Sequence, residues 1–146
     1  ASDSLGWPFL FQVLRHKGFS KRWIGWIAIL LRTASTKVVV NECPGESFAH
    51  ACGLRQGDPV SSLLFVITLE VLLAMFRKGA EEGVVSSFNG ISATLRLSVY
   101  ADDVALFIKP TNQGLTFVKH ALDCFGTASG LVVNYTKSKA IMIRGP

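Results

Sequence analysis

The spacing of hydrophobic residues in the first part of the chain predicts two short amphipathic helices. The first begins at Pro8, a residue that favours the first turn of a helix, and ends at Gly18. Ser20 is a favoured N-cap residue and starts the second helix. One stripe of this second helix, spaced as a single buried face requires, holds Trp23, Ile24, Ile27 and Leu30 or Leu31.

The middle of the chain predicts a hairpin followed by a long helix. Residues 38–40 are expected to form a strand, residues 44–46 a turn, and residues 47–52 the returning strand. A long helix is expected over about residues 60–79, with Asp58 or Ser61 as its N-cap. Apolar residues cover most sides of this helix, which indicates that it is buried.

The last third alternates strands with one more helix. Residues 95–99 and 104–108 predict a second hairpin, joined by Tyr100, Ala101, Asp102 and Asp103. A helix then runs from Pro110 and Thr111 to Gly130, and residues 132–133 and 140–143 are expected to close the fold as strand pieces. This order predicts one α+β domain in which helices pack on one face of an antiparallel sheet.

Composition narrows the class of protein. The chain has 146 residues, of which 49% are hydrophobic and 17% charged, so disorder is excluded. The apolar run over residues 23–31 is too short to span a bilayer, and no membrane partner is expected. The three cysteines include no CxxC pair, which favours reduced thiols in an intracellular protein.

The positive charge is concentrated near the N-terminus. Residues 1–40 hold six basic residues and one acidic residue, Asp3, which accounts for the whole net charge of +5. Such a basic end suits a polyanionic partner, although a solvated helix face gives the same pattern.

The adjacent residues Asp102 and Asp103 are the clearest candidates for chemical function in the sequence. Adjacent carboxylates at a hairpin tip repel each other unless a cation lies between them, and Mg²⁺ favours such oxygen ligands together with substrate phosphates. Successive strand residues point to opposite faces, so Asp102 is expected to be the closer ligand and Asp103 the more peripheral one. Ordinary turn chemistry is the alternative explanation of an Asp-Asp pair.

Two further segments could bind a nucleotide. In residues 53–59, Arg55 can pair with phosphates, Gln56 offers a donor and an acceptor, and Gly57 permits close approach to the backbone. A plain strand-to-helix turn would also explain this segment. Further along, Lys137 could protonate a leaving pyrophosphate, or belong to a solvated basic edge.

Together, and in this order, these motifs resemble the palm of a reverse transcriptase. The quoted segments are Gly53 to Pro59 with Ser61, Tyr100-Ala101-Asp102-Asp103, and Ser129-Gly130 with Asn134, Lys137 and Ser138. The resemblance covers essentially the whole chain and is nearest to the non-LTR (LINE-type) retrotransposon enzymes of plant type. It implies an RNA-directed DNA polymerase that extends a DNA primer on an RNA template by two-metal transfer of deoxynucleotides.

The resemblance also implies roles for individual residues. Asp102 and Asp103 would be catalytic ligands of Mg²⁺ or Mn²⁺, and Tyr100 would lie near the primer terminus. Gln56 and Gly57 would contact the incoming nucleotide and the template, supported by Arg55. Lys137 would be the general acid, and the basic helices of residues 15–37 would lie toward the nucleic acid.

The N-terminus departs from the family pattern. Ala1-Ser2-Asp3 matches only the tail of the first catalytic box, whose metal-bridging Asp would lie four residues upstream of Ala1. Ser2 stands where the family has the aromatic residue that excludes the ribose 2′-hydroxyl. We therefore expect a fragment of partial fingers plus palm, truncated at both ends, that lacks the first catalytic strand and the thumb.

As such a fragment, the isolated chain is expected to be inactive and to aggregate or expose a large apolar patch. Its partners would include the remaining fingers, the thumb and endonuclease segments of a parent polyprotein. The resemblance implies work at chromosomal DNA in the nucleus, but no nuclear signal is readable in the sequence.

Three alternatives stay open from the sequence. The chain could be a nucleic-acid-binding remnant of a decayed element, which the Ser2 departure favours. It could also be a reverse transcriptase of the group II intron type. An RNA-dependent RNA polymerase is the third, and residues 55–59, Arg-Gln-Gly-Asp-Pro, argue against it.

Overall fold

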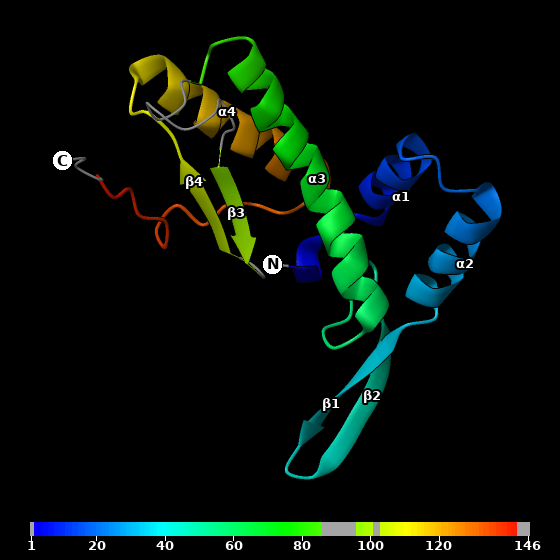
Figure 1. Cartoon of the computed structure of the whole chain (residues 1–146). Helices are drawn as coiled ribbons and strands as arrows, with labels where there is room; N and C mark the ends of the chain where they lie inside the picture. Colours follow the sequence, from blue (N-terminus) through cyan, green and yellow to red (C-terminus); the bar gives the residue numbers. More distant parts are fainter. Residues whose placement is uncertain (1, 86–95, 101–102, 143–146) are drawn as a thin grey trace.

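The computed structural model describes residues 2–85, 96–100 and 103–142, and it has an α+β fold (Figure 1). The elements along the chain are the 3₁₀ turn η1 (Ser2–Ser4), α1 (Trp7–His16), α2 (Lys21–Arg32), β1 (Ser35–Val40), β2 (Cys43–Ala49), α3 (Pro59–Glu81), β3 (Arg96–Tyr100), β4 (Asp103–Phe107) and α4 (Asn112–Ser129). The α+β class predicted from the sequence is confirmed.

Helix α3 is the centre of the molecule. Helices α1 and α4 both pack against it, and α2 packs on α1 (Figure 1). The core between these helices includes Leu10 and Leu14 of α1 together with Leu72 and Phe76 of α3. An ion pair between Lys17 and Glu70 also connects the end of α1 to α3. The helical layer is therefore a single hydrophobic unit onto which both hairpins are attached.

The predicted helix ends are confirmed by their capping hydrogen bonds. The Ser20 hydroxyl accepts a hydrogen bond from the Trp23 amide at the start of α2, and the Asp58 carboxylate accepts one from the Val60 amide at the start of α3. Gly130 ends α4 in the left-handed conformation with φ of 80°. These short polar side chains and this glycine satisfy backbone groups that helix ends leave without intrahelical partners.

The first hairpin has its turn at a different place from the one predicted. Val40 pairs with Cys43, so residues 41–42 form a two-residue turn, with φ of 49° at Asn41 and 64° at Glu42. Two successive positive φ angles match the right-handed twist of a hairpin. Pro44, which we expected in the turn, lies in β2 instead. A two-stranded sheet has only edge strands, and these tolerate proline.

The remaining strand predictions have mixed outcomes. β3 and β4 pair antiparallel as expected, and they form a second two-stranded sheet separate from β1–β2. Tyr100 and Asp103, which were predicted in the connection, instead pair with each other as the last residue of β3 and the first of β4. The described residues therefore contain two small sheets rather than one. The strand pieces predicted at residues 132–133 and 140–143 are not formed at residues 132–133 and 140–142, and Ile143 lies outside the described residues. A turn forms at residues 135–137 of this segment.

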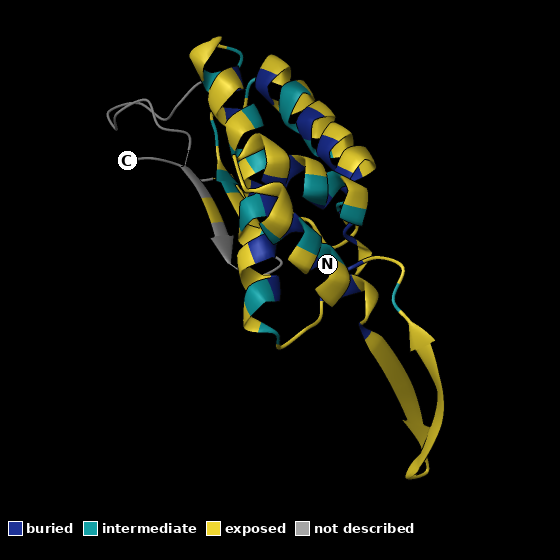
Figure 2. Ribbon diagram, turned by 90° about the vertical axis from the view of Figure 1, so that its right-hand side faces the viewer, coloured by how far each residue is buried: buried dark blue, intermediate teal, exposed yellow. Residues whose placement is uncertain are grey.

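Helix α3 is less buried than its apolar sequence predicts. Leu64 and Phe76 are buried, whereas Leu63 and Val66 on the opposite side are exposed. By length and composition α3 alone among the described helices could cross a membrane, a test that core helices also pass. The hairpin β1–β2 projects from the helical layer and is exposed along its whole length (Figure 2). The chain thus has much uncovered apolar surface, and its aggregation stays a prediction.

Two helical glycines should respond oppositely to alanine. A Cβ at Gly79 of α3 would overlap the Phe117 ring of α4, whereas a Cβ at Gly25 of α2 would meet no other atom. We expect Gly79→Ala to lower the free energy of unfolding by about 1–3 kcal/mol. Gly25→Ala should raise it by about 0.5–1 kcal/mol, because alanine loses less backbone entropy. Urea unfolding of the two variants tests this pair, and equal effects would contradict the close α3–α4 packing.

Candidate nucleotide-binding site

The segment between β2 and α3 is tied to the N-terminal turn at Gly53. The Gly53 amide donates to the Leu5 carbonyl at 2.8 Å, and the Gly53 carbonyl accepts from Trp7 Nε1 at 2.8 Å. The next amide, that of Leu54, donates to the Ser2 carbonyl at 3.0 Å. Gly53 has φ of 81°, a conformation that favours glycine. These contacts place the loop of residues 53–58 beside η1 rather than leaving it free in solvent.

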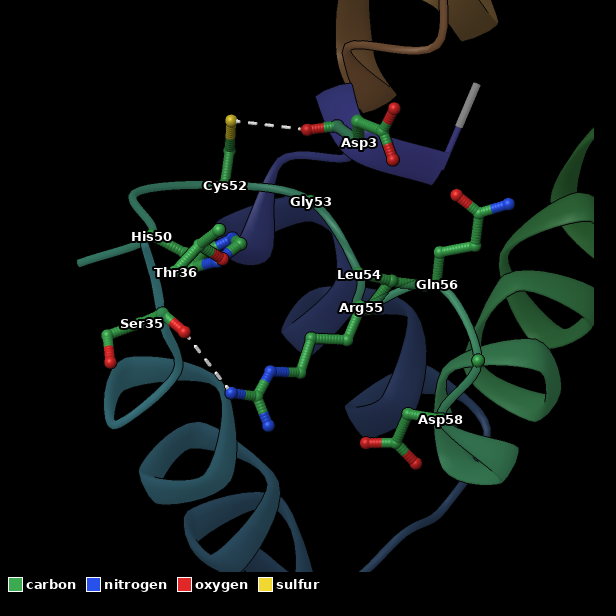
Figure 3. Close-up of a pocket in the computed structure, with 11 residues that line it drawn as sticks. Asp3, Ser35, Thr36, His50, Cys52, Gly53, Leu54, Arg55, Gln56 and Asp58 are labelled. Atoms are coloured by element: carbon green, nitrogen blue, oxygen red, sulfur yellow. Dashed lines mark hydrogen bonds between the residues drawn. The ribbon is translucent and has the colours of Figure 1, made fainter. Parts of the chain in front are cut away.

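This arrangement forms an open cavity of about 580 Å³ at the surface. Three segments that are distant in sequence meet there, namely η1, the start of β1 and the loop that leads into α3 (Figure 3). The polar and charged residues in its lining include Asp3, Ser35, Thr36, His50, Arg55, Gln56 and Asp58. A volume of this size lies within the range of small-molecule sites.

The sequence-predicted binding residues Arg55, Gln56 and Gly57 all line this cavity and are all exposed. The Arg55 guanidinium donates to the Ser35 carbonyl at 3.4 Å, which directs this side chain across the cavity toward β1 (Figure 3). Gly57 has φ of 88° and open space where a side chain would lie. The cavity therefore presents a cation, an amide side chain and an accessible backbone on one wall.

The second predicted feature, the acidic hairpin, is separate from the lining of this cavity. Asp103 is exposed at the first position of β4, and Tyr100 is the last residue of β3. Asp102 lies outside the described residues. In Figure 1, the end of the hairpin where β3 stops and β4 starts is directed toward the half of α3 that follows the cavity loop. The hairpin end and the cavity loop therefore lie toward the same half of α3 in this view.

Lys137 lies in the turn that follows α4, and it is exposed. The Asn134 side chain shapes this turn, because its oxygen accepts hydrogen bonds from the amides of Thr136 and Lys137 at 3.1 and 3.2 Å. The Tyr135 hydroxyl donates to the Asp123 carboxylate of α4 at 2.6 Å. This contact fastens the segment that carries Lys137 to the helix.

The Tyr135–Asp123 contact predicts a measurable titration. The hydrogen bond to Asp123 raises the pKa of Tyr135 above its ordinary value of 10.0, with desolvation and the Asp123 charge acting in the same direction. Its stabilising effect is therefore present below that ordinary value and is lost as the pH rises through the raised pKa. Asp123→Asn should lower the pKa of Tyr135 toward 10.0.

The measurement is an ultraviolet absorbance titration in a Tyr100→Phe background, which leaves Tyr135 as the single tyrosine. Lys119→Ala, a change at another exposed position of α4, is the control and should leave the titration unchanged. An unchanged pKa in Asp123→Asn would show that the hydrogen bond is not formed in solution.

The carboxylates of the acidic hairpin are suitable ligands for a divalent metal ion. Among the residues that the structure describes, no group of three or more His, Cys, Asp or Glu side chains is close enough to hold a metal, and Asp103 has no ion pair. An exposed aspartate beside a second aspartate in the sequence supplies the oxygen donors that Mg²⁺ prefers. One or two carboxylates suffice when substrate phosphates provide the remaining ligands.

No sequence motif indicated the opposite wall of the cavity. Thr36 and His50 hydrogen-bond to each other at 2.6 Å between Oγ1 and Nε2, and both line the cavity. Ser2 is half-buried in η1, and its carbonyl accepts the hydrogen bond from the Leu54 amide of the loop. Thr36 and His50 had no distinguishing sequence signal, because their proximity depends on hairpin pairing and not on spacing within a motif.

The described elements form an α+β domain, and comparison with known families gives the class of protein to which the chain belongs. A family model for reverse transcriptase (RNA-dependent DNA polymerase) matches residues 1–144, and the chain belongs to this family. It is therefore a reverse transcriptase domain by family, as the sequence motifs implied.

The relatives of this chain include proteins of transposable elements. The chain is 28% identical over 145 residues to the transposon TX1 uncharacterized 149 kDa protein of Xenopus laevis, a match over 97% of this chain and 11% of that protein. It is 28% identical over 147 residues to the retrovirus-related Pol polyprotein of the type-2 retrotransposable element R2DM of Drosophila melanogaster, covering 99% of this chain and 13% of that polyprotein. The resemblance to non-LTR retrotransposon enzymes is confirmed, and the plant origin stays a prediction.

The chain spans only about a tenth of the length of these two relatives. A polyprotein of this family carries other segments beside the reverse transcriptase domain. The division into partial fingers and palm stays a prediction.

Proposed function

We propose that this chain provides the nucleotide-binding loop and the metal-binding hairpin of an RNA-directed DNA polymerase that extends a DNA primer on an RNA template. The observation that carries the proposal is the cavity between Asp3 and residues 55–58, which the loop forms only because Gly53 is fastened to the N-terminal segment. The reverse transcriptase match over residues 1–144 supports the same assignment.

In this proposal the cavity binds the incoming deoxynucleoside triphosphate next to the template base. Arg55 offers a guanidinium that can pair with phosphate oxygens, and its bond to the Ser35 carbonyl limits its motion. Gln56 can hydrogen-bond to a base or sugar, and the bare backbone at Gly57 permits close approach. Binding and orientation are the contributions of this loop to the reaction.

Asp102 and Asp103 would hold the Mg²⁺ ions, and Mn²⁺ has the same oxygen preference. When bound, these ions supply charge stabilisation and alignment of the attacking and leaving oxygens of phosphoryl transfer. Tyr100 precedes this pair at the end of β3 and would lie beside the primer terminus. Lys137 would deliver a proton to the departing pyrophosphate, and the turn held by Asn134 would keep it in place.

The remaining fingers, the thumb and an endonuclease segment of a polyprotein would complete the enzyme, so the chain alone is expected to be inactive. The second candidate function is a nucleic-acid-binding remnant without catalysis. Ser2 favours it, because a serine in place of the usual aromatic residue removes the expected barrier to the ribose 2′-hydroxyl.

Primer extension separates the two functions. A polyprotein that carries residues 1–146 is incubated with an RNA template, an annealed DNA primer, deoxynucleotides and Mg²⁺. The polymerase proposal expects template-directed addition of the complementary deoxynucleotide. RNA binding that depends on salt but not on Mg²⁺, without any addition to the primer, would establish the remnant instead.

A further inference from the structure

One face of α2 is uncovered and combines aromatic, aliphatic and basic side chains. The buried stripe of this helix consists of Ile24, Ile27 and Leu31. On the opposite side lie residues spaced three or four apart, which share a helix face. This α2 outer face consists of Arg22, Trp26, Ile29 and Arg32, all exposed.

The geometry around Trp26 is that of an ordered aromatic platform. The Arg22 guanidinium carbon lies over the indole ring, 5.0 Å from its centroid. Trp26 is nevertheless 56% exposed, so a large part of the ring is open to a partner. A cation held against an indole both restrains the ring and places a positive charge beside whatever stacks on it.

The chain segment that carries this face has only positive charges. Residues 4–41 contain no acidic residue and six basic ones. Among the described residues, the two ion pairs are Lys17–Glu70 and Lys78–Glu82, so Lys21, Arg22 and Arg32 are left without a carboxylate. The electrostatic complement of this face is therefore a polyanion.

We propose that the α2 outer face binds single-stranded RNA, with an unpaired base stacked on Trp26 and the adjacent phosphates paired with Arg22 and Arg32. Stacking platforms next to basic side chains are the means by which proteins hold single strands without reading sequence. A duplex keeps its bases stacked on one another and offers no free base to the indole. A protein partner of this face would need to bury two cations, Arg22 and Arg32, as well as the apolar side chains, at a desolvation cost.

The position of α2 links this surface to the cavity. Arg32 is the last residue of the helix, and Ser35, three residues later, lines the cavity and accepts the hydrogen bond from Arg55. An RNA strand that passes the cavity can continue along α2 toward Trp26. Identifying this strand as the template rests on the proposed function, whereas the binding of single-stranded RNA by this face does not.

The experiment measures fluorescence anisotropy of a short labelled polyuridine RNA titrated with the 146-residue chain, with EDTA present and no deoxynucleotides. Trp26→Ala should weaken binding about 30-fold, the middle of the range for loss of one stacked base. Trp26→Phe should keep the affinity within a few fold, because phenylalanine retains a stacking face.

Charge and stacking are separated by the salt dependence of binding. Arg22→Ala should lower the slope of log affinity against log salt by about 0.7, the value for one lost single-strand phosphate contact, whereas Trp26→Ala should leave this slope unchanged. The matched control is Arg77→Ala on α3, an exposed arginine with no described partner. It should leave both affinity and slope unaltered. Circular dichroism of each variant checks that the fold is intact.

Three results would overturn the proposal: RNA affinity unchanged in Trp26→Ala, an equal loss in Arg77→Ala, or duplex RNA bound as tightly as the single strand. A change in oligomeric state of Trp26→Ala by sedimentation, with RNA affinity unchanged, would identify a protein-docking face instead. Asp102→Asn should bind RNA normally in this assay, so failure of the polymerase assignment and failure of this proposal give different outcomes.

Discussion

Replacing Asp102 with asparagine is expected to lower RNA-templated DNA synthesis by at least about 100-fold, in a polyprotein that carries this domain. The substitution keeps the size of the side chain and removes its negative charge. A neutral amide is a much poorer ligand for a hard divalent cation than a carboxylate. The stabilisation of the reacting phosphate would be lost together with the metal.

Asp103→Asn should have a smaller effect, because Asp103 is expected to be the more peripheral ligand. Single-turnover primer extension with each variant measures the two effects on the chemical step. Glu81→Gln, at an exposed carboxylate that ends α3, is the matched control and should be as active as the unchanged protein. Full activity in Asp102→Asn would remove the hairpin from the active site.

Gly53→Ala is expected to lower the free energy of unfolding by about 3 kcal/mol, a large share of the total stability of a domain. Two costs add up at this position. Gly53 has φ of 81°, which an L-residue adopts at a cost, and its Cβ would overlap the backbone carbonyl of Asp3. That carbonyl belongs to η1 and cannot move without breaking the contacts of Leu5 and Ser2 with the loop.

Gly57→Ala separates these two costs. Gly57 has φ of 88° but has no atom near the position of an added Cβ, so only the backbone cost of about 1–2 kcal/mol applies. Urea unfolding of both variants, followed by tryptophan fluorescence, gives the difference. If Gly53→Ala is no less stable than Gly57→Ala, the close contact between the loop and Asp3 is not formed in solution.

Local sequence signals were sufficient for the helices of this protein. Ser20, Asp58 and Gly130 end or begin helices at the predicted places, because capping hydrogen bonds involve residues within one turn of each other. Local signals predicted the wrong turn for the first hairpin. Pro44 and Gly45 are typical turn residues, but the pairing of Val40 with Cys43 places the turn at Asn41 and Glu42.

The candidate site, like the fold, was predicted only in part from the sequence. The motifs selected Arg55, Gln56, Asp102 and Asp103 as candidate site residues, and the family match over residues 1–144 agrees with the resemblance on which that selection rests. The roles of these residues stay predictions. The sequence also left open whether residues 53–59 were an ordinary turn.

The sequence by itself thus determined the family, the helices and the acidic pair of the hairpin. Only the tertiary structure decided that Asp3, Thr36 and His50 meet Arg55 around one cavity, since their contacts join segments up to about fifty residues apart in the chain. Periodicity predicted the buried stripe of α2, and the structure confirms Ile24, Ile27 and Leu31 in it. Only the folded chain shows that Trp26 on the opposite side stays exposed with the Arg22 guanidinium over its ring. Hydrogen bonds and packing between distant segments leave no local pattern in the sequence, and this is why the cavity and the α2 outer face required the folded molecule.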